Sequence, residues 1–264
     1  MSSTRTIEDS GDLPWMVMVH GMSQDHRIFS AQVAAFRATH RILLVDLPGH
    51  GLSAAIGGPY GHEEFADHVA GAMRGRGVTA ARLWGTHTGA TVGLLVAADA
   101  PELIGALILE GPVVPGCNPP VVTETIARAR ATVRELGIDA ARDEWWRTSC
   151  WFAAIRADPI GKRAAAHHAI VAAFGGRPWA DDAAPRLVAR VEARLATISA
   201  PALVYNGAED HTDFLTAATE IDGLLAKGTR ALIPGAGGFP AWERPNEVNA
   251  VVNRFLRTLG AVGA

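Results

Sequence analysis

Hydrophobic residues along this chain form short continuous runs that are separated by segments with helical periodicity. Four apolar runs lie in the first half, at residues 15–19, 41–46, 78–85 and 104–110. Three segments between them have helical spacing, at residues 30–37, 63–75 and 88–100. A continuous apolar run is typical of a strand that is buried on both faces. The regular alternation of strand and helix therefore predicts an α/β protein with a mostly parallel, doubly wound sheet.

The alternation stops after residue 111 and resumes near residue 200. In between, Ala, Arg and Trp recur at helical spacing without a convincing strand. The later strands are expected at residues 202–206 and 230–233, with helices at residues 214–225 and 245–259. The pattern predicts a core domain made of residues 1–111 and 200–264, with a helical lid at residues 112–199.

A glycine-bracketed turn follows the third predicted strand, at Gly85-Thr86-His87-Thr88-Gly89. Strand, tight turn and helix in this order match the nucleophile elbow G-x-nucleophile-x-G. Side chains in place of the two glycines would collide with the strand and the helix. The central residue is expected to adopt a strained, left-handed backbone and to point into a cavity above the sheet. That residue is His87.

Composition and charge exclude several functional classes. The chain has 264 residues, of which 48% are hydrophobic and 19% are charged, so it can build a buried core. Its net charge of −3, without a basic cluster, indicates no basic surface that would bind nucleic acid or an acidic membrane. No apolar run approaches the ~20 residues of a membrane span, and the polar residues 1–13 predict no secretory signal. We therefore expect a cytoplasmic protein, and its oligomeric state stays open.

The cysteines and the other polar residues indicate neither a disulfide framework nor a metal site. The two cysteines are Cys117 and Cys150, and His, Asp and Glu show no clustered ligand spacing. No cofactor is expected.

Four motifs together resemble the α/β-hydrolase superfamily, over essentially the whole chain. They are His20-Gly21 after the first strong strand, Asp46-Leu47-Pro48-Gly49-His50-Gly51-Leu52-Ser53, the elbow, and the late loop from Gly235 to Pro245. The resemblance implies an α/β-hydrolase fold with a lid (cap) insertion. The Trp-rich lid resembles those of enol-lactonases, C–C hydrolases and cofactor-free dioxygenases. Fewer than 15 residues precede the first strong strand, which leaves little room for the antiparallel hairpin usual in the family.

Two positions depart from the family pattern. The nucleophile position holds His87 and the base position of the late loop holds Gly238. A Ser-His-acid triad needs a hydroxyl, an imidazole that takes its proton, and a carboxylate that orients the imidazole. Because the first two groups are missing, ordinary serine-hydrolase chemistry is not predicted.

His87 can supply other chemistry. Its ring is expected at the N-terminus of a helix, where the dipole disfavours an imidazolium, and a neutral imidazole is a competent base. The resemblance implies an oxyanion hole made by the backbone amides of Met22 and Thr88. A base and an oxyanion hole together favour cofactor-independent, non-hydrolytic acid/base chemistry, such as cyclisation, elimination, isomerisation or C–C bond making and cleavage.

Two carboxylates and a set of larger side chains complete the predicted site. Asp210 matches the usual acid position and Glu110 an alternative one, so either is a candidate to orient His87. The substrate is expected to be a small apolar molecule, possibly aromatic or polyketide-like. Its candidate contacts are His20 and four lid tryptophans, Trp145, Trp146, Trp151 and Trp179.

Two alternatives remain open. In the first, His87 activates water against an ester or lactone, so that the protein is a hydrolase without an acyl-enzyme. In the second, His87 only fills the turn of a catalytically inactive ligand-binding or accessory protein.

Overall fold

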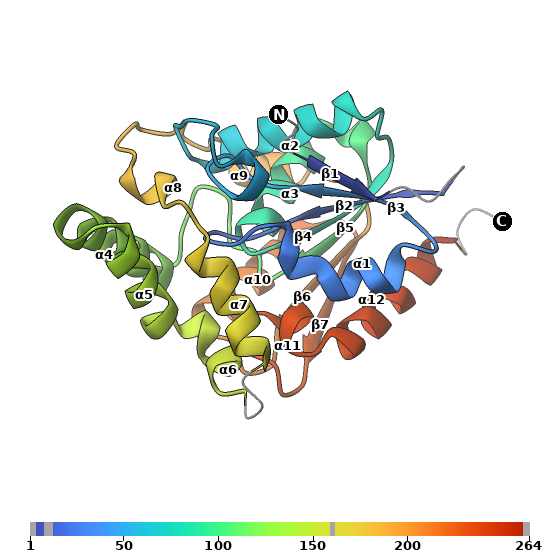
Figure 1. The fold of residues 1–264 in the computed structure, drawn as a ribbon. Coiled ribbons are helices and arrows are strands. Elements are labelled where there is room, and N and C mark those ends of the chain that lie inside the picture. Colours follow the sequence, from blue (N-terminus) through green and yellow to red (C-terminus); the bar gives the residue numbers. More distant parts are fainter. Residues whose placement is uncertain (1–3, 8–12, 159–161, 261–264) are drawn as a thin grey trace.

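A seven-stranded sheet forms the centre of the protein in the computed structural model, which describes residues 4–7, 13–158 and 162–260. Its strands are β1 (Thr4–Ile7), β2 (Trp15–Val19), β3 (Arg41–Val45), β4 (Ala81–Thr86), β5 (Ile104–Glu110), β6 (Ala202–Gly207) and β7 (Gly228–Ile233). Their order is β1-β3-β2-β4-β5-β6-β7 (Figure 1). All neighbouring strands pair in parallel except β1, which runs antiparallel to β3. The predicted mostly parallel sheet is confirmed.

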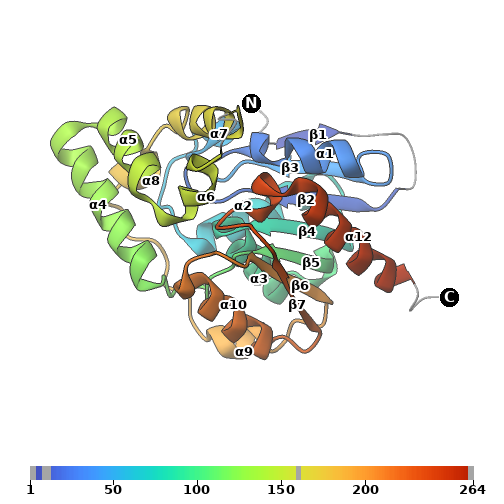
Figure 2. The same cartoon turned by 90° about the horizontal axis from the view of Figure 1, so that it is seen from below.

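Helices cover both faces of the sheet because each central strand buries side chains on both sides. In β2, Trp15, Val17 and Val19 pack into one core, whereas Met16 and Met18 pack into the other. The first face is covered by α2 (His62–Gly75), α3 (Thr88–Asp99) and α10 (Thr212–Leu224). The second is covered by α1 (Ser30–Phe36) and α12 (Pro245–Gly260), as Figure 2 shows.

The interval between β5 and β6 is helical, and its described residues contain no strand. Its helices are α4 (Pro120–Leu136), α5 (Ile138–Thr148), α6 (Ala153–Arg156), α7 (Lys162–Ala172), α8 (Arg177–Ala180) and α9 (Val191–Leu195), with a 3-10 turn at Cys150–Phe152. Helices α4 to α8 lie to one side of the sheet (Figure 1). Helix α9 instead packs against α3 and α10, which places it in the core layers. The lid boundaries at residues 112 and 199 stay a prediction.

Four short helical turns connect the larger elements. They are the 3-10 turns His26–Phe29, Gly51–Ser53 and Pro101–Leu103, and the helix α11 (Pro240–Glu243). The first two lie beside residues 21–24, called the oxyanion turn because they include the predicted oxyanion donor Met22, and α11 lies within the late loop.

The strand β1 was not predicted. The sequence leaves little room for antiparallel pairing before residue 15, yet Thr4–Ile7 pairs with β3 at the edge of the sheet. It is short and only partly buried, so it has no continuous apolar run. The rest of the polar lead, at residues 1–3 and 8–12, lies outside the described residues. No helix in the described part of the chain combines the length and the apolar character that a membrane span requires.

Substitution of Gly89 by Ala is expected to lower the free energy of unfolding by about 2 kcal/mol or more. A Cβ at Gly89 would overlap the carbonyl groups of Val19 and His20, both backbone atoms. Gly71→Ala in α2 is the matched control, because a Cβ there meets no atom within 4 Å and Ala favours helix by about 0.5–1 kcal/mol. Urea unfolding of both variants measures the difference. Equal stability of the two variants would contradict this account of the elbow.

Candidate active site

His87 occupies the tight turn between β4 and α3. Its backbone has φ 45° and ψ −110°, a conformation that few non-glycine residues adopt. The turn has no room for larger flanking residues, because a Cβ at Gly85 would overlap the backbone of Gly89. The His87 amide donates to the Glu110 carbonyl over 2.7 Å, which ties the turn to the end of β5. The predicted elbow geometry is present.

The imidazole of His87 is held in one tautomer. Its Nε2 lies 2.7 Å from the Gly238 carbonyl oxygen. Because a carbonyl can only accept, Nε2 carries the proton and Nδ1 keeps a lone pair. In the described part of the chain, no group hydrogen-bonds Nδ1. Burial lowers the pKa of His87 from its ordinary 6.5 to about 4, so the ring is neutral at physiological pH.

Aromatic rings surround the imidazole. The ring centroids of Phe214 and Phe239 lie 4.8 Å and 4.5 Å from that of His87, both in edge-on arrangements. These apolar neighbours explain the desolvation of the ring. The fixed proton position and the low pKa define His87 as a neutral but weak base.

The base position of the family pattern is closed by the lid. A Cβ at Gly238 would lie 2.7 Å from both the Cβ and the carbonyl oxygen of Trp151, and 2.8 Å from its Cα. An imidazole at this position would therefore collide with the Trp151 backbone. Trp151 fills the space beside residue 238, and the Gly238 carbonyl binds His87.

The backbone amides of Met22 and Thr88 are available as hydrogen-bond donors. Both residues line the same cavity as His87. Thr88 is the first residue of α3, whose N-terminal amides have no partner within the helix. In the described part of the chain, neither amide donates to an acceptor. Two free donors beside the imidazole fit the predicted oxyanion hole.

His20 lies beneath the oxyanion turn and does not line the cavity. Its Nε2 accepts from the Leu47 amide at 3.0 Å, so its Nδ1 is protonated and donates to the Gly21 carbonyl at 2.7 Å. That carbonyl belongs to the same planar peptide as the Met22 amide. His20 thus binds the peptide of the turn from outside the cavity, and its predicted contact with substrate stays a prediction.

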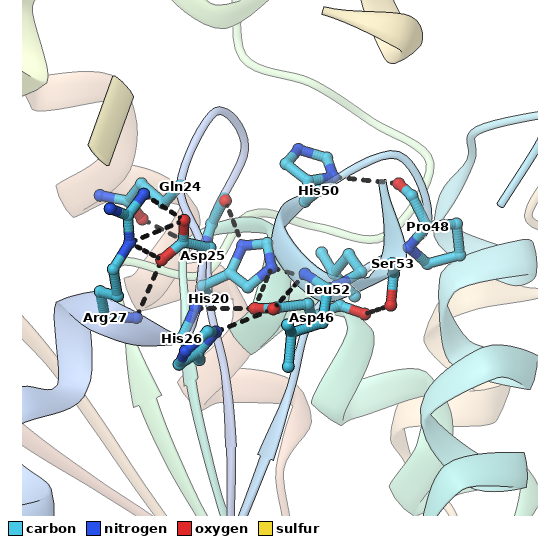
Figure 3. Close-up of polar contacts among 12 residues, drawn as sticks. His20, Gln24, Asp25, His26, Arg27, Asp46, Pro48, His50, Leu52 and Ser53 are labelled. Carbon is cyan, nitrogen blue, oxygen red and sulfur yellow. Dashed lines mark hydrogen bonds and ion pairs between the residues drawn. The ribbon is translucent and has the colours of Figure 1, made fainter. Parts of the chain in front are cut away.

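Asp46 joins the residues around the turn (Figure 3). Its carboxylate accepts from the backbone and ring nitrogens of His26 at 2.7 Å and 2.8 Å, and from the Leu52 amide at 2.8 Å. These hydrogen bonds hold the pKa of Asp46 low, at about 2, against the effect of burial. The carboxylate stays ionised and fixes the two loops that carry the turn.

Neither predicted carboxylate bonds the imidazole of His87. Asp210 accepts from the Asn206 side chain at 3.0 Å and from the His211 amide at 2.8 Å. Burial raises the pKa of Asp210 to about 6. Its oxygens are satisfied by groups next to it in the chain, which keeps it in its own loop.

Glu110 lies in a fully buried network. Its carboxyl accepts from the Tyr205 hydroxyl at 2.9 Å and from the Ala241 amide at 2.7 Å, and Trp84 donates to Tyr205. Burial raises the pKa of Glu110 to about 8, so it is mostly protonated near neutral pH. The Ala241 bond anchors the segment after Gly238, and the Glu110 carbonyl accepts from the His87 amide. Glu110 therefore supports His87 through backbone groups, and its carboxyl group makes no hydrogen bond to the imidazole.

The cavity in front of His87 has a volume of about 310 Å³ and mostly aromatic or aliphatic walls. Of the four predicted lid tryptophans, Trp145, Trp151 and Trp179 line it. Trp146 does not, because its ring packs against Phe152 and His167 inside the lid. The cavity suits an apolar substrate with one or two aromatic-sized groups.

The outer part of the cavity is more polar. Arg130 and Arg186 reach it, but both are engaged: Arg130 binds the Asp182 carboxylate and Arg186 binds Glu64. The guanidinium groups are therefore largely neutralised by acidic side chains. Among residues 4–7, 13–158 and 162–260, no group of three His, Cys, Asp or Glu is placed to hold a metal ion, and both cysteines are free thiols.

Sequence reasoning missed several residues of the site. Phe214 and Phe239 contact the His87 ring, although the late-loop motif already contains Phe239. Ser23 and Gln24 follow Met22 and bind two lid side chains. Ser23 has φ 63°, but no sequence pattern marks a serine for that conformation.

Comparison with known proteins gives a matching fold. A family model described as alpha/beta hydrolase fold matches residues 14–148. The enol-lactonase from Burkholderia xenovorans LB400 superposes with a TM-score of 0.82 at 24% identity, over 96% of this chain and 95% of that one. MenH from S. aureus superposes with a TM-score of 0.84 at 20% identity, over 98% and 100%. At this identity the two structures support the fold alone.

Curated relatives match over a shorter segment. A pimeloyl-[acyl-carrier protein] methyl ester esterase from Xylella fastidiosa is 32% identical over 104 residues, which are 39% of this chain and 38% of that enzyme. A 2-(acetamidomethylene)succinate hydrolase from Mesorhizobium japonicum is 28% identical over 105 residues, 40% and 38% of the two chains. The match thus spans well under half of either relative.

Gly238→Ala is expected to lower the free energy of unfolding by about 1–3 kcal/mol, because its methyl group would meet the Trp151 backbone. Gly223→Ala in α10 is the control, since a Cβ there meets nothing within 4 Å. Chemical unfolding of both variants measures the effect. A Gly238→Ala protein as stable as the wild type would show that the late loop and the lid separate easily.

The low pKa of His87 predicts a pH-dependent stability. Below pH 6.5 the unfolded state binds a proton that the folded ring does not accept until about pH 4. Compared with His87→Asn, the wild type should therefore lose up to about 3 kcal/mol as the pH falls from 6.5 to 4, and nothing above 6.5. Unfolding free energies of both proteins across this range test it. A constant difference would mean that the ring is solvated.

Proposed function

Because this chain belongs to the α/β-hydrolase fold family, we propose that it hydrolyses an activated ester or lactone of a small apolar substrate, with water as the nucleophile. The observation that carries the proposal is the state of His87. Its Nε2 proton is bound by Gly238, and in the described part of the chain its Nδ1 has no hydrogen-bond partner. His87 lines the same cavity as Met22 and Thr88, whose amides are unpaired. The esterase and hydrolase activities of the curated relatives support the same class.

The reaction needs one proton transfer in each direction. Water attacks the substrate carbonyl carbon while Nδ1 of His87 takes a proton from it. The carbonyl oxygen becomes negative and accepts hydrogen bonds from the amides of Met22 and Thr88. When the tetrahedral intermediate collapses, the bond to the leaving oxygen breaks and the imidazolium returns its proton to that oxygen. The products are an acid and an alcohol, and no acyl-enzyme forms.

The weak basicity of His87 limits the substrate. An imidazole with a pKa of about 4 assists the attack of water only weakly, so the substrate needs a strongly electrophilic carbonyl group. Aryl and enol esters and strained lactones have such a carbonyl group. The apolar walls formed by Trp145, Trp151 and Phe214 suit the acyl or aryl part of such a substrate.

A second candidate uses the same groups without water. The central residue of the elbow carries no hydroxyl or thiol, and Trp151 fills the space beside residue 238, which favours chemistry without a covalent intermediate. Here His87 would remove a proton next to a carbonyl, and the amides would stabilise the enolate for an elimination, isomerisation or cyclisation. Removing a proton from carbon needs a stronger base than assisting water does, so hydrolysis ranks first.

Purified protein should release acid from phenyl or enol esters or small lactones, and His87→Asn should lower kcat/KM at least about 100-fold. In H₂¹⁸O the acid should take up one labelled oxygen, and mass spectrometry should detect no acyl-enzyme. The rate should be flat above pH 5 and fall as the pH drops through about 4, where His87 becomes protonated. Serine-directed phosphonates should not react.

His211→Asn is the matched control. It removes an imidazole next to Asp210, and Asn can keep the capping role of His211 at the start of α10, so the rate should not change. Turnover of a carbonyl compound without uptake of labelled oxygen would replace hydrolysis by the second candidate. Ligand binding that His87→Asn leaves intact, without any turnover, would overturn both and identify a binding protein.

A further inference from the structure

The oxyanion turn, residues 21–24, is held from the lid as well as from the core. Trp145 in α5 donates from Nε1 to the Ser23 hydroxyl at 2.8 Å. In α7, Nε2 of His167 lies 2.9 Å from the side-chain nitrogen Nε2 of Gln24. Ser23 and Gln24 directly follow Met22, the proposed oxyanion donor. Two separate lid helices thus bind the two residues next to that amide.

The hydrogen bonds fix the direction of each group. The Gly21 amide donates to Oε1 of Gln24 at 3.2 Å, so the other end of this side chain is the NH₂ group. That NH₂ group donates to Nε2 of His167, which must therefore be unprotonated. All of these groups are buried. Two hydrogen bonds therefore link the Gly21 amide, the Gln24 side chain and His167 of the lid, and they fix the orientation of the Gln24 side chain.

Core and lid contacts converge on one peptide. The Gly21 carbonyl accepts from His20 at 2.7 Å and from the Gln24 amide at 3.4 Å. Since the peptide is planar, the Met22 N–H points opposite to that carbonyl. Ser23 is held in a left-handed conformation, with φ 63°, that is unfavourable for this residue without support. The Trp145 bond supplies part of that support.

We propose that Trp145 and His167 are positioning residues, which orient the Met22 amide for catalysis only while the lid is packed against the turn. The inference rests on the proposed function, in which that amide stabilises the oxyanion. Trp145 also lines the cavity, so substrate that packs against its ring presses on the same side chain that holds Ser23. Enclosure of substrate and assembly of the oxyanion hole are then one event.

Three replacements separate positioning from packing. Trp145→Phe keeps an aromatic ring and removes the N–H group. His167→Leu keeps the volume and removes the acceptor, whereas His167→Gln keeps an acceptor for Gln24. If His167 only filled space among its aromatic neighbours, the His167→Leu variant would keep more activity than the His167→Gln variant. If it positions Gln24, Gln restores function and Leu does not.

The orientation of the turn can be observed without any substrate. The chain has five methionines, so labelling with ¹⁵N-methionine gives a simple spectrum in which the Met22 amide can be assigned by Met22→Leu. Trp145→Phe and His167→Leu should shift and broaden that signal, and His167→Gln should leave it close to the wild-type position. His168→Gln, on the same helix as His167, is the control that should not shift it.

The second measurement is the steady-state kinetics of these variants, with whichever ester the hydrolysis assay described above identifies as a substrate. Trp145→Phe and His167→Leu should lower kcat about tenfold or more, up to the ~10²–10³-fold loss that follows removal of an oxyanion donor. KM for His167→Leu should change less than about twofold. An unmoved Met22 signal in both variants, or a His167→Leu protein at least as active as His167→Gln, would overturn the inference. A wild type that hydrolyses no ester refutes the proposed hydrolysis, while the Met22 signal still decides whether the lid positions the turn.

Discussion

The hydrogen bond from His87 to the Gly238 carbonyl depends on residue 238 having no side chain. That bond sets the tautomer of the imidazole, and the same missing side chain lets the Trp151 backbone approach the late loop. Elbow, late loop and lid are therefore interlocked at one point. Any side chain at residue 238 would push the lid away and move the carbonyl that holds the His87 proton. His87 and Gly238 therefore form one structural unit, in which the imidazole of the first binds the backbone of the second.

The acidic side chains near the strand ends serve this arrangement indirectly. Glu110 binds the Ala241 amide and so holds the loop whose carbonyl contacts His87. Asp46 is satisfied by backbone and ring donors of the two loops beside the oxyanion turn. A buried carboxyl group is tolerated only with such partners. In this protein the partners are mostly backbone amides, so the carboxyl groups define loop geometry and leave the imidazole without an acidic partner.

The sequence was sufficient for most of the fold because its central strands are buried on both faces. A continuous apolar run such as Trp15–Val19 predicts a buried strand. The glycines on both sides of His87 predict a tight turn, because larger side chains there would collide with the backbone. The strand Thr4–Ile7 was not predicted because a short, half-buried edge strand has no continuous apolar run. The pairing of His87 with Asp210 could not be judged from sequence, since Asp210 is held by the neighbouring Asn206 and His211. The contact of Trp145 with Ser23 joins residues far apart in the chain, and a tryptophan at helical spacing reads equally well as core.

The surroundings that make His87 neutral also decide how reactive it can be. Rings of Phe214 and Phe239 at its edges remove water, which keeps the lone pair free but makes the protonated state costly. A base of this kind contributes little unless negative charge is stabilised elsewhere at the same moment. The two free amides can provide that stabilisation, provided that the turn carrying Met22 stays oriented. In the proposed hydrolysis, the oxyanion turn therefore has to contribute more to the rate than it would in a site with a strong base. The proposed positioning role of Trp145 and His167 follows from this requirement, because both side chains bind that turn.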